Sequence, residues 1–497
     1  ATHSKLHTEA FMKQAELRPP PAPQLLDAPA DKLSALKDAI RKVICQARGG
    51  FVAQTTLSLE ASLVGKCSIF DEVDKDLKAS VLDLSLATPG HHAVVCRRAM
   101  GCLAGLAIAD SLGHNLEFLP VTDLPGGGVY KNDEDGKGPR FEYPASDTVT
   151  HPGGEWFQPL NKFHLKPGQW TDDTSMSLCL ADSLLLRGQY DGSHLRLLFL
   201  HWWFHGLNNA FCLDPGRSSS CGLGGNIAAS FREVIGCPSA AAVPPRVASR
   251  GEDAGNGSLM RLAAVPIFYH RCPVDAQAFA YESSLSTHPG PAAAEACAFV
   301  SSLICAMLKR NESDARSASA FLEDFIAAYM ADPKREYVAD QPVSGRAEDA
   351  RAMLHRLLAS SQADDSSTER CWAWRCSSLG LETTLRNRGH EYNGFPVSAG
   401  YFGSYSMDAL AIALHCFYHT ASFNQAIVKC INCRGDADTT GAITAQISGA
   451  FYGIDNIEPA WLDSLREWDQ REIELRAVCL VYAKEVGGIG LDMQRGR

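Results

Sequence analysis

The sequence lacks the features that mark several broad classes of protein. It has no block of lysines and arginines, and 57 acidic residues outnumber 46 basic ones to give a net charge of −11. An acidic chain repels phosphates, so we expect no nucleic-acid partner, although backbone amides at helix N-termini can still bind a nucleotide. The most apolar stretches, such as 195–203, are short and contain Arg196 and His201, so we expect no membrane span.

The sequence also lacks a recognisable cysteine framework and any stretch that resembles a signal peptide. Its 17 cysteines are odd in number and lie among apolar residues of helical segments, a distribution typical of reduced, buried thiols. We therefore expect no structural disulfides and a cytoplasmic protein, with the nucleus as the alternative. Cys430 and Cys433 have the spacing of zinc ligands, but no second Cys/His pair matches them, so buried thiols are the better interpretation.

Clean alternating strand patterns are almost absent, and the chain is instead rich in helical periodicity, which predicts an all-α fold. Residues 1–90 begin with a Pro/Ala-rich run and are interpreted as an N-terminal helical extension of unknown role. Residues 91–497 form the expected main domain, with an insertion at about 312–393. Residues 120–169, rich in Gly, Pro and Asp, interrupt the helices and are long enough to form a lid, which we expect to be mobile when empty.

Two acidic clusters open predicted helices. Helix capping explains one or two Thr or Asp residues at such a position, but not several side-chain oxygens in a row. Each cluster alone is more typical of capping or of a solvated surface. Together they favour a site for hard cations, which need several oxygen ligands. The expected metal ligands are Thr171, Asp172, Asp173, Asp436, Asp438 and Thr439.

Two further elements accompany these clusters. A small-residue helix, 101–109, runs into Asp110, and Glu117 follows at the start of the expected lid, where it could supply another carboxylate. Gly222, Gly224 and Gly225 precede a helical segment. They predict either a tight turn or a site at which backbone amides bind a pyrophosphate.

Five motifs occur in the order in which they are found in ADP-ribosylglycohydrolases, a family that includes the dinitrogenase-reductase-activating glycohydrolase. They are Asp110-x-x-Gly113-x-x-x-Glu117, Trp170–Thr174, Gly255–Arg261, Thr287-His288 and Gly435–Gly441. The resemblance extends over about 93–453 and implies an all-α, orthogonal multi-helix bundle. It also implies a cleft with two Mg²⁺ ions, Mn²⁺ being the alternative. The chain departs from the family at Arg434, where a second glycine is usual, and at the insertion.

The resemblance also implies roles for individual residues. It assigns the six oxygen-bearing residues of the two clusters as metal ligands, and Asp253, Glu117 and Asp173 as candidate catalytic residues. Tyr401 and Phe402 are candidates for stacking on adenine, although aromatic residues before a helix more often belong to the core. The expected ligand-binding residues are Gly222, Gly224, Gly225, Gly255, Asn256, Gly257, His288, Tyr401 and Phe402.

The expected function is removal of ADP-ribose from a modified protein or a small molecule by hydrolysis of the ribose C1″ glycosidic bond. ADP-ribosyl-arginine is the favoured substrate, because Asp253 resembles an acid of arginine-directed members. Glu117 resembles a glutamate stressed in serine- and O-acetyl-directed members, so ADP-ribosyl-serine, O-acetyl-ADP-ribose and poly(ADP-ribose) are the alternatives. A two-metal phosphohydrolase would need the same acidic clusters. A non-catalytic binder of ADP-ribose would lose metal ligands, and all six are present here.

Overall fold

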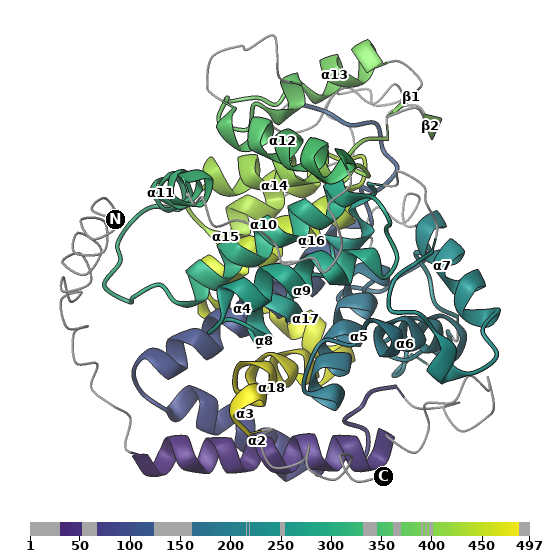
Figure 1. Cartoon of the computed structure of the whole chain (residues 1–497). Helices are drawn as coiled ribbons and strands as arrows, with labels where there is room; N and C mark the ends of the chain where they lie inside the picture. The colour runs from purple at the N-terminus through teal and green to yellow at the C-terminus, as the bar shows by residue number, and fades with distance from the viewer. Residues whose placement is uncertain are drawn as a thin grey trace, which may run out of the picture.

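The computed structural model describes residues 30–51, 67–123, 162–214, 216–217, 219–248, 254–331, 345–360, 369–388, 391–392, 395–396 and 401–486. Over these ranges the chain is a multi-helix bundle (Figure 1). The only sheet in them is a ribbon of two short antiparallel strands, β1 (Glu391–Tyr392) and β2 (Phe395–Pro396). The prediction of an all-α fold is therefore confirmed.

Two central helices, α4 (His91–Gly113) and α16 (Ala437–Tyr452), pack closely along much of their length. Small residues on both helices permit this approach. A Cβ atom added to Gly113 would lie only 2.6 Å from the carbonyl oxygen of Ala437, so glycine is required there. The packing places the end of α4, which carries Asp110, against the start of α16, which carries Asp438.

Further helices surround this pair and complete one hydrophobic core (Figure 1). Helix α5 begins at the first acidic cluster and contacts α4, α6, α8 and α18. The bounds of these helices are α5 (Asp172–Arg187), α6 (Gly192–His205), α7 (Gly225–Ile235), η2 (Ala240–Ala242), η3 (Asn256–Ser258), α8 (Ala264–Phe268), α9 (Pro273–Leu285), α10 (Pro291–Leu308), α14 (Ser406–Tyr418), α15 (Phe423–Ile431), η5 (Ile454–Asn456), α17 (Pro459–Asp469) and α18 (Glu472–Val486).

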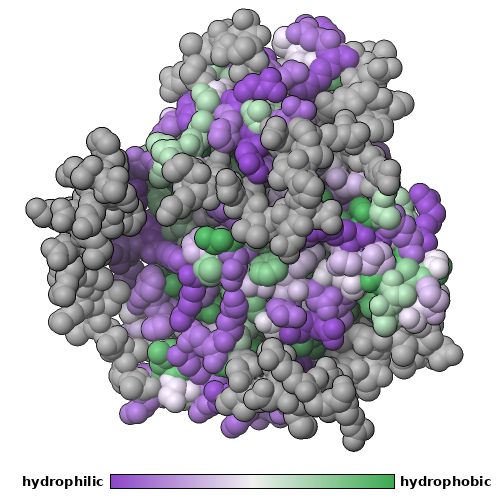
Figure 2. All heavy atoms as spheres, viewed as in Figure 1, coloured by the Kyte–Doolittle hydropathy of each residue, from purple (hydrophilic) through white to green (hydrophobic). Residues whose placement is uncertain are grey.

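Two of the helices, α4 and α10, are long and apolar enough to cross a membrane by length and composition alone. The expectation that the most apolar stretches are too short to cross a membrane was therefore wrong for these two helices. In each helix 89% of the most apolar 18-residue stretch is buried within the protein, as in the core helices of many globular folds. The face of the molecule in Figure 2 carries many hydrophilic side chains, with hydrophobic ones scattered among them.

The described part of the N-terminal extension shares the core of the main domain. Helices α2 (Ala30–Phe51) and α3 (Lys75–Ala87) pack against each other and against α18. Lys37 Nζ lies 2.7 Å from a carboxylate oxygen of Glu485, at the end of α18. Most of the predicted lid, residues 124–161, lies outside the described residues, so its mobility stays a prediction.

One disulfide corrects the expectation that the chain has none. Cys67, which precedes α3, is bonded to Cys212, which follows α6, with a Cα–Cα distance of 5.7 Å. The two cysteines are 145 residues apart, so sequence spacing cannot reveal their proximity. The remaining described cysteines are free; Cys430 is buried and Cys433 is half-buried.

Apart from β1, the described part of the insertion is helical, and its helices cover α10 and α14 (Figure 1). A charge-assisted hydrogen bond of 2.8 Å from Arg388 Nη1 to a carboxylate oxygen of Asp408 joins its last helix to α14. The helices of the insertion are α11 (Ala318–Ala331), α12 (Gly345–Ala359), η4 (Arg370–Trp372) and α13 (Leu381–Arg388).

Candidate metal centre and substrate cleft

The start of α5 is held by a carboxylate from another helix. Asp110, at the end of α4, accepts hydrogen bonds from the backbone N–H groups of Thr171 and Thr174, each at 3.0 Å. It also accepts from their hydroxyls, at 2.7 and 2.6 Å. The first turn of a helix has unpaired N–H groups, and Asp110 satisfies two of them. Asp110 therefore fixes the position of Asp172 and Asp173, a role that its motif alone did not reveal.

Carboxylates from three segments meet at this point. Asp110, Asp173 and Asp438 each place one oxygen within 4.8 Å of the others, and the same holds for Glu117, Asp436 and Asp438. Asp438 belongs to both groups and links them. Each group gathers three oxygen donors, which is the chemistry that a hard divalent cation requires. The arrangement can hold metal ions.

The electrostatics of this cluster are unfavourable for bare carboxylates. Burial, and then the neighbouring carboxylates, raise the pKa of Asp173 and Asp438 well above the usual range. The pKa of Glu117 is also raised well above its usual range, by burial and then by Asp438 and Asp436. Grouped buried carboxylates need protons or cations to compensate their charge. A cation would replace several protons at once.

Unpartnered atoms support the same conclusion. Asp173 Oδ1 and Glu117 Oε2 are buried and have no hydrogen-bond partner among the described residues. A buried oxygen without a partner is unfavourable unless it contacts water or an ion. The residues present therefore fit a divalent cation.

A cleft of about 390 Å³ opens beside the acidic cluster. Phe118, next to Glu117, is 39% exposed, and its ring stacks on that of Tyr401 with 5.5 Å between centroids. The predicted site residues that line the cleft are Glu117, Asp172, Gly222, Gly224, Gly225, Gly255, Asn256, Gly257, His288, Tyr401, Asp436, Asp438 and Thr439. Thr171 and Asp173 are buried and are not among the lining residues.

The glycine-rich loop contacts the metal cluster directly. Gly222 has a φ of +86°, which favours glycine, and a Cβ there would collide with Asp172 Oδ1. The loop passes so close to Asp172 that no other residue fits. Gly224 then precedes α7, whose first turn faces the cleft through Gly225 and Asn226. The backbone of this loop forms the tight turn that its glycines predicted. The loop also lines the cleft, where its amides could contact a pyrophosphate.

Two buried residues support the far side of the cleft. Asn256 donates hydrogen bonds from its side-chain nitrogen to Asp436 Oδ2, at 2.7 Å, and to the Gly403 carbonyl, at 2.9 Å. Arg261 donates to the Gly257 carbonyl at 2.9 Å and to the Thr287 hydroxyl at 2.7 Å. Asn256 therefore orients a candidate metal ligand, and Arg261 braces the loop and the residue that precedes His288.

Comparison with known proteins identifies this architecture. A family model described as ADP-ribosylglycohydrolase matches residues 91–486. The chain belongs to the ADP-ribosylglycohydrolase family. It is 28% identical over 373 residues to an ADP-ribosylarginine hydrolase Tri1 from Serratia proteamaculans, covering 74% of this chain and 75% of that protein.

Other members of the family are also similar. The ADP-ribosyl-[dinitrogen reductase] glycohydrolase of Rhodospirillum rubrum is 23% identical, covering 77% of this chain and 95% of that protein. The human ADP-ribosylhydrolase ARH3 is 23% identical, covering 78% and 94%. A solved structure, an ADP-ribosylglycohydrolase-related protein complex, has a TM-score of 0.50 and 24% identity, covering 79% and 99%, and shares the fold.

Some predicted site residues of this ADP-ribosylglycohydrolase are placed elsewhere. Phe402 does not line the cleft; its side chain is 1% exposed, and its carbonyl accepts the N–H of Asp436 at 2.8 Å. Its contribution is therefore to support the second acidic loop. Asp253 lies outside the described residues. Arg434 has a φ of 63°, a value that favours the glycine usual in the family.

Proposed function

We propose that this protein is a Mg²⁺-dependent hydrolase that removes ADP-ribose from modified arginine side chains by cleaving the C1″ glycosidic bond. The observation that carries the proposal is the convergence of carboxylates from α4, α5 and α16 beside a cleft lined by two glycine-containing loops. The cluster suits cations, and the loops suit a dinucleotide-like ligand.

The residues that would hold two Mg²⁺ ions, or Mn²⁺ ions, are Thr171, Asp172, Asp173, Asp436, Asp438 and Thr439. Bound ions supply positive charge that can grip hydroxyl groups and acidify water, which would replace one of the two carboxylates of a typical glycosidase. Asp173 does not line the cleft, so its proposed role is to hold an ion rather than to touch the substrate. Asp110 keeps Thr171 and Asp173 in position through α5.

Glu117 is the proposed proton donor. It lines the cleft, and burial, and then Asp438 and Asp436, raise its pKa well above the usual range, which favours the protonated form. A protonated carboxyl can deliver its proton to the leaving atom as the glycosidic bond breaks through an oxocarbenium-like state. Asp253 is the alternative acid.

The part of the cleft formed by the start of α7, His288 and Tyr401 is proposed to bind ADP-ribose. Backbone N–H groups at the start of α7 can donate hydrogen bonds to the oxygens of a pyrophosphate. Burial, and then Arg261, lower the pKa of His288 to about 3, so this residue is an uncharged hydrogen-bonding group at neutral pH. Tyr401 offers a ring at the cleft, stacked on Phe118.

Two relatives named ADP-ribosylarginine hydrolase, from Serratia proteamaculans and Pseudomonas putida, support arginine as the acceptor. Each is 28% identical to this chain, compared with 23% for human ARH3. Serine, O-acetyl and poly(ADP-ribose) substrates remain the alternatives. Cytoplasmic localisation, with the nucleus as the alternative, also stays a prediction.

The test is incubation with peptides ADP-ribosylated on arginine, serine or aspartate, with and without Mg²⁺, followed by mass spectrometry of the products. We expect free ADP-ribose from the arginine peptide, only when Mg²⁺ is present. Asp438→Ala should abolish turnover, and Asp83→Ala, a change at an exposed site on α3, should not. AMP as the product would indicate a phosphohydrolase instead, and binding without turnover would indicate a non-catalytic ADP-ribose binder.

A further inference from the structure

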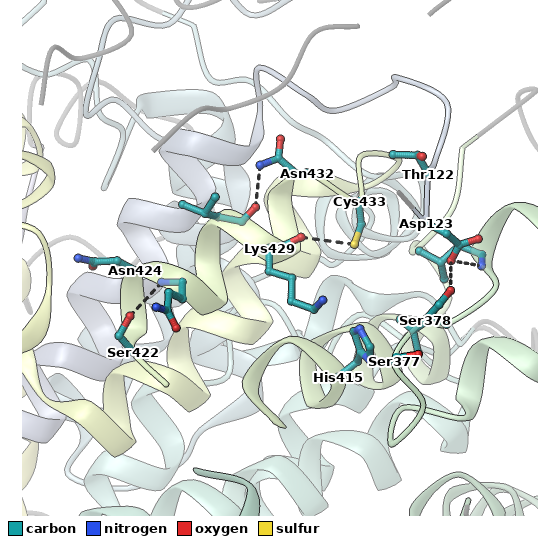
Figure 3. A pocket seen from close by; sticks show the side chains of 14 residues that line it. Thr122, Asp123, Ser377, Ser378, His415, Ser422, Asn424, Lys429, Asn432 and Cys433 are labelled. Carbon is teal, nitrogen blue, oxygen red and sulfur yellow. Dashed lines mark hydrogen bonds between the residues drawn. The ribbon is translucent and has the colours of Figure 1, made fainter. Parts of the chain in front are cut away.

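A second cavity, of about 460 Å³, lies between α15, the residues that precede α13, and Thr122 and Asp123 (Figure 3). It shares no lining residue with the metal cleft. Its volume is within the range of small-molecule sites. No step of the proposed reaction uses it.

Lys429 supplies the positive charge of this cavity. It is half-buried on α15, and its Nζ has no hydrogen bond or ion pair with any described residue. His415, on α14, also lines the cavity, and Figure 3 shows the two side chains extending into it from different helices. Burial, and then Lys429, lower the pKa of His415 to about 3, so its imidazole is neutral at pH 7. Lys429 is therefore the one positively charged residue among the described residues that line the cavity.

Asp123 is the single acid among the described residues that line the cavity, and its carboxylate already accepts hydrogen bonds from the backbone. Asp123 accepts the backbone N–H groups of Leu381, at 2.7 Å, and Glu382, at 3.0 Å, and so caps α13. The first amides of α13 are consequently not available to a ligand. A phosphate dianion carries two negative charges and is bound most tightly where several such donors surround it, whereas a single lysine matches one negative charge. Leu379 and Val428 add an apolar wall that suits a hydrocarbon body.

Two paired segments connect this cavity with the metal cleft. The N–H of Phe118 bonds to the carbonyl of Gly435 at 2.9 Å, and the N–H of Thr122 bonds to the carbonyl of Cys433 at 3.0 Å. One segment begins at Glu117 and ends in the cavity wall at Thr122 and Asp123. The other begins in the wall at Cys433 and reaches Asp436. The two segments therefore form a hydrogen-bonded connection from the cavity wall to both acids, Glu117 and Asp436.

We propose that this cavity is an effector site for an organic monocarboxylate with an apolar body. The ligand's carboxylate pairs with Lys429. Binding of this ligand changes the affinity of the metal cleft for ADP-ribose through the segments 117–123 and 433–436. The second half of the proposal rests on the proposed function, because it concerns the affinity for ADP-ribose.

Isothermal titration with 1-naphthoate tests the binding. We expect saturable binding that Lys429→Met weakens about tenfold or more, the size of one lost charge-assisted hydrogen bond. Lys75→Met, at an exposed position on α3, should bind as the wild type does. The neutral isostere 1-naphthamide should bind the wild type about as weakly as 1-naphthoate binds Lys429→Met.

Several results would overturn the assignment. Absence of saturable 1-naphthoate binding would do so, as would equal affinities of the two lysine variants. Tighter, Lys429-dependent binding of inorganic phosphate would reassign the ligand class. Val428→Trp, which fills the cavity without removing the charge, should also block 1-naphthoate, and its circular dichroism verifies that the variant is folded.

The effector role is tested by titrating ADP-ribose with Mg²⁺ in the absence and presence of saturating 1-naphthoate. Because coupling is reciprocal, we expect a change of about fivefold or more in the affinity for ADP-ribose, and an equal change for 1-naphthoate when the order is reversed. An unchanged ADP-ribose affinity overturns the effector role but does not affect the assignment of the cavity as a monocarboxylate-binding site. Failure of ADP-ribose to bind at all refutes the proposed function instead.

Discussion

Replacement of Asp173 by asparagine should have opposite effects on the stability of the protein with and without Mg²⁺. Asn is nearly the same size, and Asp173 Oδ1 has no hydrogen-bond partner among the described residues. Its other oxygen accepts only a long hydrogen bond, 3.3 Å, from the Thr171 hydroxyl. The substitution therefore removes a charge and little else.

The magnitude follows from the separation of the carboxylates. Two unit charges 4.8 Å apart, the limit within which these oxygens lie, repel by about 3 kcal/mol at an effective dielectric constant of about 20. Protonation relieves part of that energy, because burial and nearby acids raise the pKa of Asp173. We expect Asp173→Asn to stabilise the metal-free protein by about 1–3 kcal/mol at pH 8. In the wild type, Mg²⁺ at about 100 times its Kd should add roughly 2.7 kcal/mol, and the variant should lose most of this.

The pH dependence has a definite sign. A folded-state pKa above the ordinary Asp value means that the native state holds protons which the unfolded state has released. The stability of the metal-free wild type should therefore fall as the pH rises from about 4 through the raised pKa values. The advantage of Asp173→Asn should grow over the same range, and it should be smallest in acid.

Thermal melts at pH 5 and pH 8, with EDTA or with Mg²⁺, provide the assay. Asp83→Asn, on an exposed position of α3, is the matched control and should behave as the wild type does. Equal Mg²⁺-induced increases in Tm for the wild type and Asp173→Asn would show that Asp173 is not a ligand. A less stable metal-free variant at pH 8 would refute the account of charge repulsion.

Three further predictions concern the cleft and the fold. The affinity for Mg²⁺, measured by calorimetry, should rise with pH because the ions compete with protons held by Asp172 and Asp438; a flat profile between pH 5.5 and 8 would contradict this. Gly222→Ala should weaken Mg²⁺ binding about tenfold or more, since its Cβ collides with Asp172. In the control variant Gly225→Ala the added Cβ meets nothing within 4 Å. Equal Mg²⁺ affinities of the two variants would show that the loop shifts to accommodate the Cβ at Gly222. Cys67→Ser should lower the free energy of unfolding by about 2–5 kcal/mol in oxidising buffer and leave it unchanged after reduction. Urea titrations in both buffers measure this. Equal stabilities of the wild type and the variant in oxidising buffer would show that the disulfide does not stabilise the protein.

Sequence patterns predicted several features because those features are local. Helical periodicity and the scarcity of alternating segments predicted the all-α fold. The two acidic runs predicted where α5 and α16 begin, since Thr and Asp are typical of helix starts. The order of five motifs predicted the family, which the match over 91–486 shows.

Other features depend on contacts between distant segments. Asp110 was quoted only as part of a motif, and its bonds to Thr171 and Thr174 span 61 and 64 residues. The capping of α13 by Asp123 spans 258 residues, and this contact shapes the second cavity. The aromatic character of Phe402 suggested a stacking platform, whereas packing places it beneath the loop of Asp436.

The residues that could carry the chemistry are evident from local sequence, because residue type and helix-start position are local properties. Tertiary structure decided which of them meet. The close approach of α4 and α16 at Gly113 brings Asp110 and Asp438 together, and one collective site arises from carboxylates that belong to separate helices. The disulfide between Cys67 and Cys212 has the same origin, since only the folded chain brings residues 145 positions apart into contact.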